Sequence, residues 1–224
     1  MSEKYVQIIK KLRNEKGFSQ LELAKKLGIS RPSYIAIEQG KRELTLSELD
    51  KLASALGVSR EGIEGGEIPN YEKYKQMILL LLRMNKQITK TKLAKLLYLA
   101  DFAWYYSNLQ SMSGMQYRKI QYGPVAEPYF RIIDEMFDGG EILIEQTKEG
   151  AMLISQTRGG AKANLSNITA EEKKLLEKID KKWKGKKTSD IVAFTHKQMP
   201  YMFAEENDIV SYDIFTQENP DEIF

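Results

Sequence analysis

Two short amphipathic helices, joined by almost no connecting chain, are the feature of this sequence that most restricts its fold. The first is predicted for residues 19–27, because Ser19 followed by Glu22 has the spacing of a capping box. It ends at Gly28, since glycine tolerates the left-handed backbone of a helix C-terminus. The second is predicted for residues 30–39, with a serine cap and a proline in its first turn. Helices this short are stable only when packed, so the pair predicts a small helical domain.

Three further helices complete a predicted N-terminal domain of residues 1–63. One precedes the pair, one begins near Thr45, and a last short helix follows Ser59. The segment 64–70 contains adjacent glycines and a proline, which are typical of a linker. We therefore predict two domains, residues 1–63 and 71–224, on either side of that linker.

The charge of the chain is unevenly distributed. The net charge of +3 is too small to suggest a nucleic-acid partner. Residues 1–42, however, carry 10 Lys and Arg against 4 acidic residues, whereas the segment from Glu205 onward carries seven acidic residues and no Lys or Arg. This distribution predicts a module that faces a polyanion, joined to a module with another task. We expect the acidic terminus to be solvated; the alternative is that it mimics nucleic acid or covers a basic protein partner.

Composition also excludes several classes of chemistry. The absence of cysteine excludes disulfides, cysteine-ligated zinc, iron–sulfur clusters and a cysteine nucleophile. The single histidine, His196, excludes the paired-histidine motif H-E-x-x-H, and we interpret it as a structural hydrogen-bonding residue. The N-terminus has no signal-peptide pattern, and no apolar run approaches the ~20 residues of a membrane span. We therefore expect a cytoplasmic protein that binds rather than catalyses, without metal or cofactor.

The string S-Q-L-E-L-A-K-K-L-G-I-S-R-P-S-Y-I-A-I-E-Q-G-K-R resembles the Cro/C1-type (XRE) repressor family, and the resemblance covers roughly residues 5–63. The resemblance implies a five-helix, lambda repressor-like domain with a helix-turn-helix that binds a palindromic operator as a homodimer or higher homo-oligomer. It also implies a set of residues that contact phosphates or base edges: Gln20, Ser30, Arg31, Ser33, Lys41 and Arg42. Arg31 is the best candidate for a guanine contact. Ile35 and Leu44 depart from the family pattern, so the operator sequence cannot be inferred. The spacing of Tyr34 favours a core position over base stacking.

Patterns in the second domain predict an α+β fold that is mainly helical. The expected elements are a helix over 71–84, a central helix from Thr89 or Thr91, a strand over 116–121, a helix ending near Gly139, a hairpin of 141–147 with 151–157, a helix from Thr169 through Trp183, and a short helix from Ser189 or Asp190 that Pro200 interrupts.

Three motifs of this domain, K-L-A-K-L-L-Y-L-A-D-F-A-W-Y-Y, Y-G-P-V and F-T-H-K-Q-M-P-Y, together resemble the Panacea (SocA-like) antitoxin domain from about Tyr71 to Phe215. Tyr201 stands where that family usually has tryptophan. The resemblance implies direct binding and neutralisation of a protein toxin encoded by the adjacent gene. With the N-terminal module, it further implies an antitoxin of a type II toxin–antitoxin system that represses its own operon.

Residues in these motifs allow both a structural and a functional interpretation. We interpret Tyr98, Asp101 and Trp104 as core residues with a polar staple rather than as a catalytic cluster. The candidates for toxin contact are aromatic and basic residues that we expect to be exposed: Tyr105, Tyr106, Tyr117 and Arg118.

Two other function classes remain open. A one-component transcriptional regulator would use the second domain to sense a small molecule or another protein, and would show a pocket with convergent polar groups. An enzyme tethered to a helix-turn-helix, such as a metalloprotease, would need an H-E-x-x-H motif, which the sequence lacks.

Overall fold

The computed structural model describes residues 3–56, 63 and 69–224, and the chain folds as two compact units, Met1–Pro69 and Asn70–Phe224. Each unit has its own hydrophobic core. The helix expected after Ser59 and most of the expected linker lie outside the described residues. The prediction of a mainly helical protein with small antiparallel sheets is confirmed. No described helix is long and apolar enough to cross a membrane.

Unit 1 packs short helices around one core. They are α1 (Glu3–Glu15), α2 (Gln20–Leu27), α3 (Arg31–Glu38) and α4 (Leu46–Leu56). As predicted, Ser19 and Glu22 form a capping box at α2, and Ser30 caps α3. Gly28 adopts the left-handed conformation (φ 76°) that lets α3 start at once. Tyr34 is fully buried, so its predicted place in the core is confirmed.

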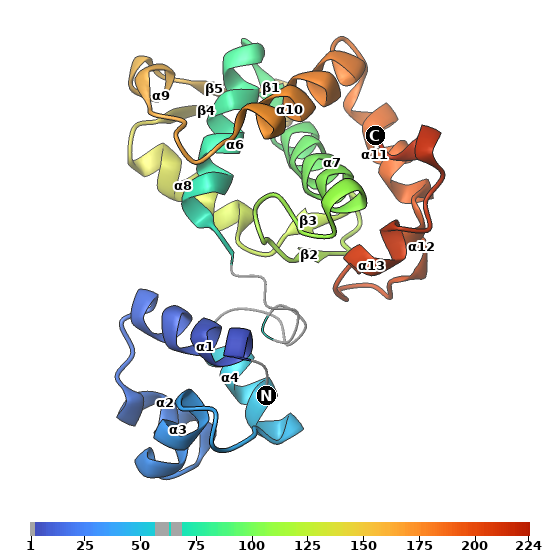
Figure 1. Cartoon of the computed structure of the whole chain (residues 1–224). Coiled ribbons are helices and arrows are strands. Elements are labelled where there is room, and N and C mark those ends of the chain that lie inside the picture. The colour runs from blue at the N-terminus through green and yellow to red at the C-terminus, as the bar shows by residue number, and fades with distance from the viewer. Residues whose placement is uncertain (1–2, 57–62, 64–68) are drawn as a thin grey trace. The chain divides into compact units, whose positions relative to one another are not determined.

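Unit 2 is built around one central helix. Its elements are α6 (Tyr71–Met84), β1 (Ile88–Thr89), α7 (Lys90–Asn108), β2 (Tyr117–Arg118), β3 (Val125–Ala126), α8 (Tyr129–Asp138), β4 (Ile142–Gln146), β5 (Met152–Gln156), α9 (Arg158–Lys162), α10 (Ala170–Trp183), α11 (Thr188–Lys197), α12 (Met199–Phe203), α13 (Tyr212–Phe215) and the 3₁₀ helix η1 (Pro220–Glu222). Helix α7 runs through the middle of this unit, with α6, α10, α11 and α13 packed around it (Figure 1).

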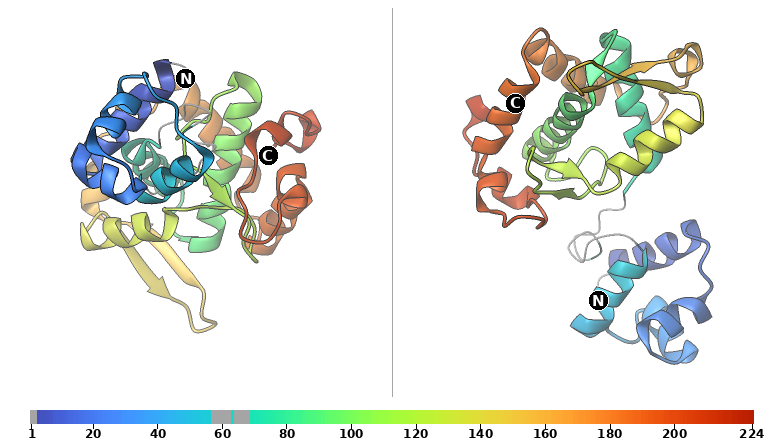
Figure 2. Two further views of the ribbon diagram at one scale, coloured as in Figure 1. Left: turned by 90° about the horizontal axis from the view of Figure 1, so that it is seen from below. Right: turned by 180° about the vertical axis from the view of Figure 1, so that it is seen from behind.

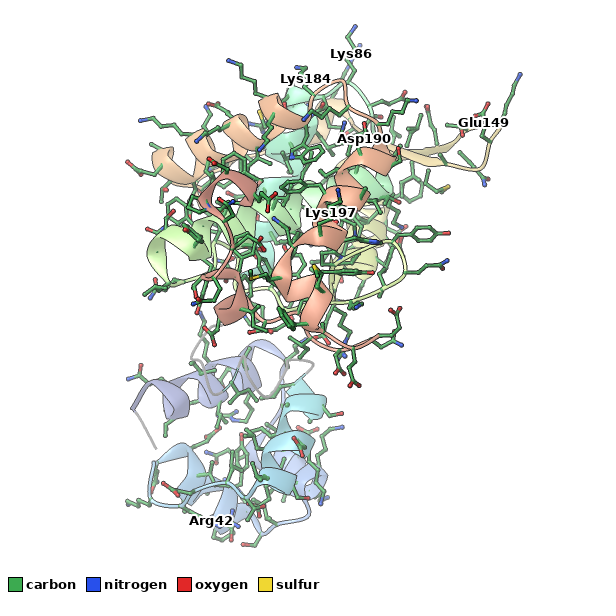
Figure 3. The ribbon with its side chains drawn as sticks, turned by 90° about the vertical axis from the view of Figure 1, so that its right-hand side faces the viewer. Arg42, Lys86, Glu149, Lys184, Asp190 and Lys197 are labelled. Carbon is green, nitrogen blue, oxygen red and sulfur yellow. The ribbon has the colours of Figure 1, made fainter. Side chains whose placement is uncertain are left out.

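Two small antiparallel sheets complete unit 2. The predicted hairpin is present as β4 and β5, with Ile144 opposite Ile154. Its turn projects from the body of the unit (Figure 2), and Glu149 lies at its tip (Figure 3). The edge strand β1 pairs with β5, and β2 pairs with β3. Sequence periodicity did not indicate β1, because two residues are too few to show alternation. The strand expected over 116–121 is shorter than predicted and spans only Tyr117–Arg118.

The acidic C-terminal segment packs onto unit 2, so the expectation of a solvated terminus is wrong. Val210 and Phe215 are fully buried in the core of the unit. The backbone N–H of Val210 donates to the carbonyl of Tyr117 (2.8 Å), and the N–H of Met199 donates to the carboxylate of Glu218 (2.7 Å). Apolar residues spaced between the acidic ones anchor the segment, while most of the charges stay exposed.

Candidate functional site

The first candidate site is the N-terminal end of α3. Arg31 is the first residue of this helix and is exposed. Beside it, the Oγ atoms of Ser30 and Ser33 lie 2.9 Å apart, and the Ser33 N–H donates to Ser30 Oγ at 3.2 Å. Three of the six residues expected to contact DNA therefore share one helix terminus, where the partial positive charge of the helix dipole favours an anion.

A buried carboxylate holds α2 and α3 together behind this surface. Glu38 is 8% exposed and accepts hydrogen bonds from Arg13 Nε (2.6 Å), Gln20 Nε2 (2.9 Å) and Tyr34 Oη (3.1 Å). Burial by itself raises the pKa of Glu38, but the hydrogen bonds from Arg13 and Gln20 outweigh it and leave the pKa lowered. Sequence reasoning missed Arg13 and Glu38, since residues 25 positions apart carry no local pattern.

Lys41 and Arg42, expected to reach the flanking DNA backbone, differ in their surroundings. Lys41 is exposed. Arg42 Nη2 pairs with Glu48 Oε1 at 2.7 Å, and the Glu48 carboxylate also accepts the N–H of Thr45 at 3.0 Å. The side chain of Arg42 remains 33% exposed (Figure 3 labels it in unit 1). Arg42 is therefore engaged in an ion pair within unit 1, whereas Lys41 shows no ion pair among the described residues.

The second candidate site lies in unit 2, where the three sequence motifs converge. A Cβ placed on Gly123 would lie 2.8 Å from Lys95 Cε, 3.1 Å from Thr195 Oγ1 and 3.2 Å from His196 Cδ2. Gly123 also has φ +90°, which other residues rarely adopt. Because Gly123 has no side chain, Lys95 of α7 and the pair Thr195 and His196 of α11 can pack closely against it.

Lys95 is fully buried at this convergence. Its Nζ donates to the carbonyl of Pro124 at 2.8 Å, and the described residues show no carboxylate paired with it. Burial lowers the pKa of Lys95 to about 7, because desolvation disfavours the ammonium form. The sequence motif contains this lysine, but its pattern gave no indication that the side chain points into the core.

His196 is held by stacking rather than by the hydrogen bond we expected for it. Its ring lies parallel to that of Tyr201, with centroids 4.3 Å apart. Its Nε2 is buried and has no hydrogen-bond partner within the described part of the chain. Burial lowers the pKa of His196, and the charges of Lys95 and Lys119 lower it further. Lys119 in turn lies over the Tyr201 ring, 4.6 Å from its centroid.

Asp101 forms the polar staple that the sequence predicted. Its carboxylate is fully buried and accepts three hydrogen bonds, from the N–H of Ser113 (2.6 Å), from Ser113 Oγ (2.5 Å) and from Tyr117 Oη (2.7 Å). These bonds tie α7 to the loop that leads into β2. Tyr98 is fully buried and Trp104 is half-buried.

The expected toxin contacts are less exposed than we predicted. Tyr117 is fully buried, so its expected exposure is wrong, because its hydroxyl is needed by Asp101. Tyr105 and Tyr106 are half-buried against α13, and Tyr105 Oη donates to Asp213 at 2.5 Å. Arg118 is exposed and pairs with Glu127 at 2.5 Å.

Comparison with known proteins agrees with this division of the chain. A helix-turn-helix family model matches residues 9–63, and a model of the SocA-like antitoxin, Panacea domain matches residues 93–201. YonR, an SPbeta prophage-derived HTH-type transcriptional regulator of Bacillus subtilis, is 36% identical over 93 residues, which are 40% of this chain and 86% of that protein. The chain belongs to the HTH-type transcriptional regulators. Its second unit carries a SocA-like Panacea antitoxin domain.

A second regulator supports the same assignment for unit 1. The HTH-type transcriptional regulator YqaE of Bacillus subtilis is 41% identical over 59 residues, which are 26% of this chain and 51% of that protein. No solved structure matches the chain at a significant level. The resemblance to helix-turn-helix and Panacea families that the sequence motifs indicated is therefore confirmed by the family models.

Proposed function

We propose that this regulator is the antitoxin of a type II toxin–antitoxin system. In this proposal unit 2 neutralises a protein toxin, encoded by the adjacent gene, through direct binding, and unit 1 represses the shared operon as a homodimer on a palindromic operator. Residues 64–70 act as the linker between the two. The observation that carries the proposal is that two units with separate cores match a helix-turn-helix model and an antitoxin-domain model.

The proposed DNA contacts are the six residues at and around α3, with Arg31 in the base-reading role. Arg31 is exposed at the helix terminus, and the network around Glu38 fixes that helix against α2. Gln20 has a hydrogen bond to Glu38, so its proposed phosphate contact would add to this internal role. For the toxin, we propose contacts from Tyr105, Tyr106 and Arg118, whereas Tyr117 is buried and cannot contact a partner.

Expression of the adjacent gene tests the antitoxin role. We expect that gene to stop growth when expressed alone, and growth to recover when the full chain is expressed with it. Residues 70–224 alone should restore growth as well, because that segment contains the whole second core. An adjacent gene that is harmless by itself would refute the proposal. Protection by the full chain but not by residues 70–224 would refute the assignment of toxin binding to unit 2.

Repression is tested with the promoter of the same operon. The full chain should protect a palindromic sequence from nuclease digestion, whereas residues 70–224 should leave it unprotected. If both proteins gave the same footprint, unit 1 would not be the DNA-binding module.

The alternative of a regulator that senses a small molecule is favoured by one specific observation, which is a cavity in unit 2. Among the described residues, Lys95 and Tyr129 lie in its wall, and its volume is about 380 Å³. Such volumes are typical of small-molecule sites, which span roughly 300–1,000 Å³.

A further inference from the structure

The cavity in unit 2 is formed where four separate parts of the chain meet. Its wall includes the start of α7, the segment from Ile120 to Phe130, the turn before β5 with the first residue of that strand, and Thr188 at the start of α11. Tyr122, Phe130 and Met152 contribute to this wall and are 61%, 50% and 38% exposed, so they lie at its rim. The wall is largely apolar and aromatic, which suits the body of a small organic molecule.

The charged side chains among the described residues of the cavity wall are all cationic. Lys90 and Lys95 are its charged members, and no Asp or Glu is among the described residues that line it. Lys90 lies over the Phe130 ring, 5.2 Å from its centroid, and its nearest carboxylate is that of the exposed Asp134 at 3.8 Å. A cavity with cationic groups and no carboxylate favours an anionic occupant.

Lys95 is a buried group of this wall that makes fewer hydrogen bonds than its ammonium allows. An ammonium group donates up to three hydrogen bonds. The structure shows one for Lys95, to the carbonyl of Pro124 at 2.8 Å, and no described carboxylate offsets the cost of burying the charge. An anion in the cavity would provide both the missing acceptor and the missing charge. Because Lys95 is fully buried, such a group must enter the cavity rather than dock on the outer surface.

We propose that this cavity is a binding site for a small-molecule carboxylate with an apolar or aromatic body. The carboxylate pairs with Lys95, and the body lies among Ile120, Val125 and the rim residues Tyr122, Phe130 and Met152. The site gives unit 2 a small-molecule input in addition to any protein partner, and it does not depend on the toxin proposal. An acidic side chain of a partner protein is the competing occupant.

Titration calorimetry of the full chain tests the proposal with benzoate and hexanoate as probes. Benzamide and hexanamide are the matched neutral probes, since they keep the shape and lose the charge. We expect binding of at least one carboxylate, and weaker binding of its amide by about tenfold or more, because a hydrogen bond to a charged group is lost. If neither carboxylate binds, or if carboxylates and amides bind equally, the proposal is wrong, and an acidic group of a protein partner remains the alternative.

Three variants locate the binding. Lys95→Met keeps the length of the side chain and removes the charge, and should lower carboxylate affinity by about tenfold or more. Ala151→Phe places a ring in the cavity from the exposed hairpin turn and leaves every residue of α7 unchanged, and it should abolish binding of both kinds of probe. Lys86→Met removes an exposed lysine outside the cavity wall and should leave affinity unchanged. Carboxylate binding that survives Ala151→Phe and Lys95→Met at full strength would place the site elsewhere.

Discussion

The ammonium of Lys95 donates a hydrogen bond of 2.8 Å to the carbonyl oxygen of Pro124, inside the core of unit 2. This bond joins the first motif of the unit to the second, 29 residues further along the chain. Lys95 is fully buried, and burial lowers its pKa to about 7. The protein therefore carries, in its core, a lysine that is only partly protonated at neutral pH.

The stability of unit 2 should rise with pH because of Lys95. In the unfolded chain a lysine has a pKa of about 10.4, so between that value and the folded pKa of Lys95 the unfolded state binds more protons. Relative to Lys95→Met, the wild type should gain about 2 kcal/mol of unfolding free energy between pH 7 and pH 9. Urea unfolding measures this, with tryptophan fluorescence as the probe, because Trp104 and Trp183 both lie in unit 2.

Two groups near Lys95 must be considered in that experiment. His196 has a lowered pKa and so stays neutral across the window, and Lys119, whose charge contributes to that lowering, is present in both proteins. Methionine also loses the bond to Pro124, but that cost does not vary with pH. If the difference in unfolding free energy between wild type and Lys95→Met stays constant from neutral to alkaline pH, Lys95 is not desolvated as described.

Replacement of Gly123 by alanine should disturb the same site. The new Cβ would lie 2.8 Å from Lys95 Cε, so the end of the Lys95 side chain would have to shift and its hydrogen bond to Pro124 would be disturbed. Gly150 is the matched control, since its φ of +85° is similar to the +90° of Gly123 and its Cβ would meet no atom within 4 Å. Gly123→Ala should lower the unfolding free energy by about 1–3 kcal/mol more than Gly150→Ala. Equal losses of unfolding free energy in the two variants would mean that the cost comes only from the backbone conformation and not from the contact with Lys95.

The sequence predicted local features of the fold well. The caps at Ser19 and Ser30, the helix start at Thr169 and the β4–β5 hairpin depend on residues within a few positions of one another, and all of them are present. Such features follow from local hydrogen bonds and alternation, which a single sequence displays.

Features that depend on contacts across the chain could not be predicted. Periodicity placed Tyr117 on a strand but could not reveal which face is covered, and Val210 pairs with its carbonyl from the C-terminal segment. The convergence of Lys95, Gly123 and His196 depends on how α7 and α11 pack, which no local pattern shows. Family resemblance identified the motifs, yet it did not indicate that they share one site.

Loss of the Asp101 carboxylate should destabilise unit 2 strongly. Asp101→Asn replaces one acceptor oxygen by a donor that faces Ser113 and Tyr117, so buried donors lose their partner. We expect a loss of about 2–4 kcal/mol, and about 1–2 kcal/mol for Tyr117→Phe. In the double variant the losses should fall short of their sum by about 0.5 kcal/mol or more, because both changes remove the same bond. If the two losses of unfolding free energy were strictly additive in urea unfolding, the proposed hydrogen bond between Tyr117 and Asp101 would be contradicted.

Arg31 and Lys41 should affect DNA binding differently. Arg31→Ala should cost about 1–3 kcal/mol of operator binding and relax the preference for one sequence, as expected for a base contact. Lys41→Ala should weaken binding to all sequences alike and reduce the salt slope by about 1, as expected for a phosphate contact. Fluorescence anisotropy with operator and scrambled duplexes at several salt concentrations separates the two. Unchanged sequence preference in Arg31→Ala would remove its base-reading role.

Glu38→Gln should weaken DNA binding without removing any group that faces DNA. Glutamine cannot form the ion pair with Arg13, and it carries an amide donor among side chains that donate to this position. We expect a loss of about 1–3 kcal/mol in the stability of unit 1 and faster hydrogen exchange in α2 and α3. The lowered pKa of Glu38 means that its stabilisation is present above the unfolded pKa and is lost as pH falls through the folded one, so Glu38→Gln should abolish that part of the acid sensitivity.

Glu43→Gln is the matched control for Glu38→Gln, because it removes an exposed carboxylate from the same unit. It should leave hydrogen exchange in α2 and α3 unchanged, and its effect on operator affinity should be small and lost at high salt. If hydrogen exchange in α2 and α3 were as slow in Glu38→Gln as in the wild type, the network around Glu38 would not be what holds α3 in place. Reduced affinity would then have to come from a direct interaction of Glu38 with DNA, which its burial makes unfavourable.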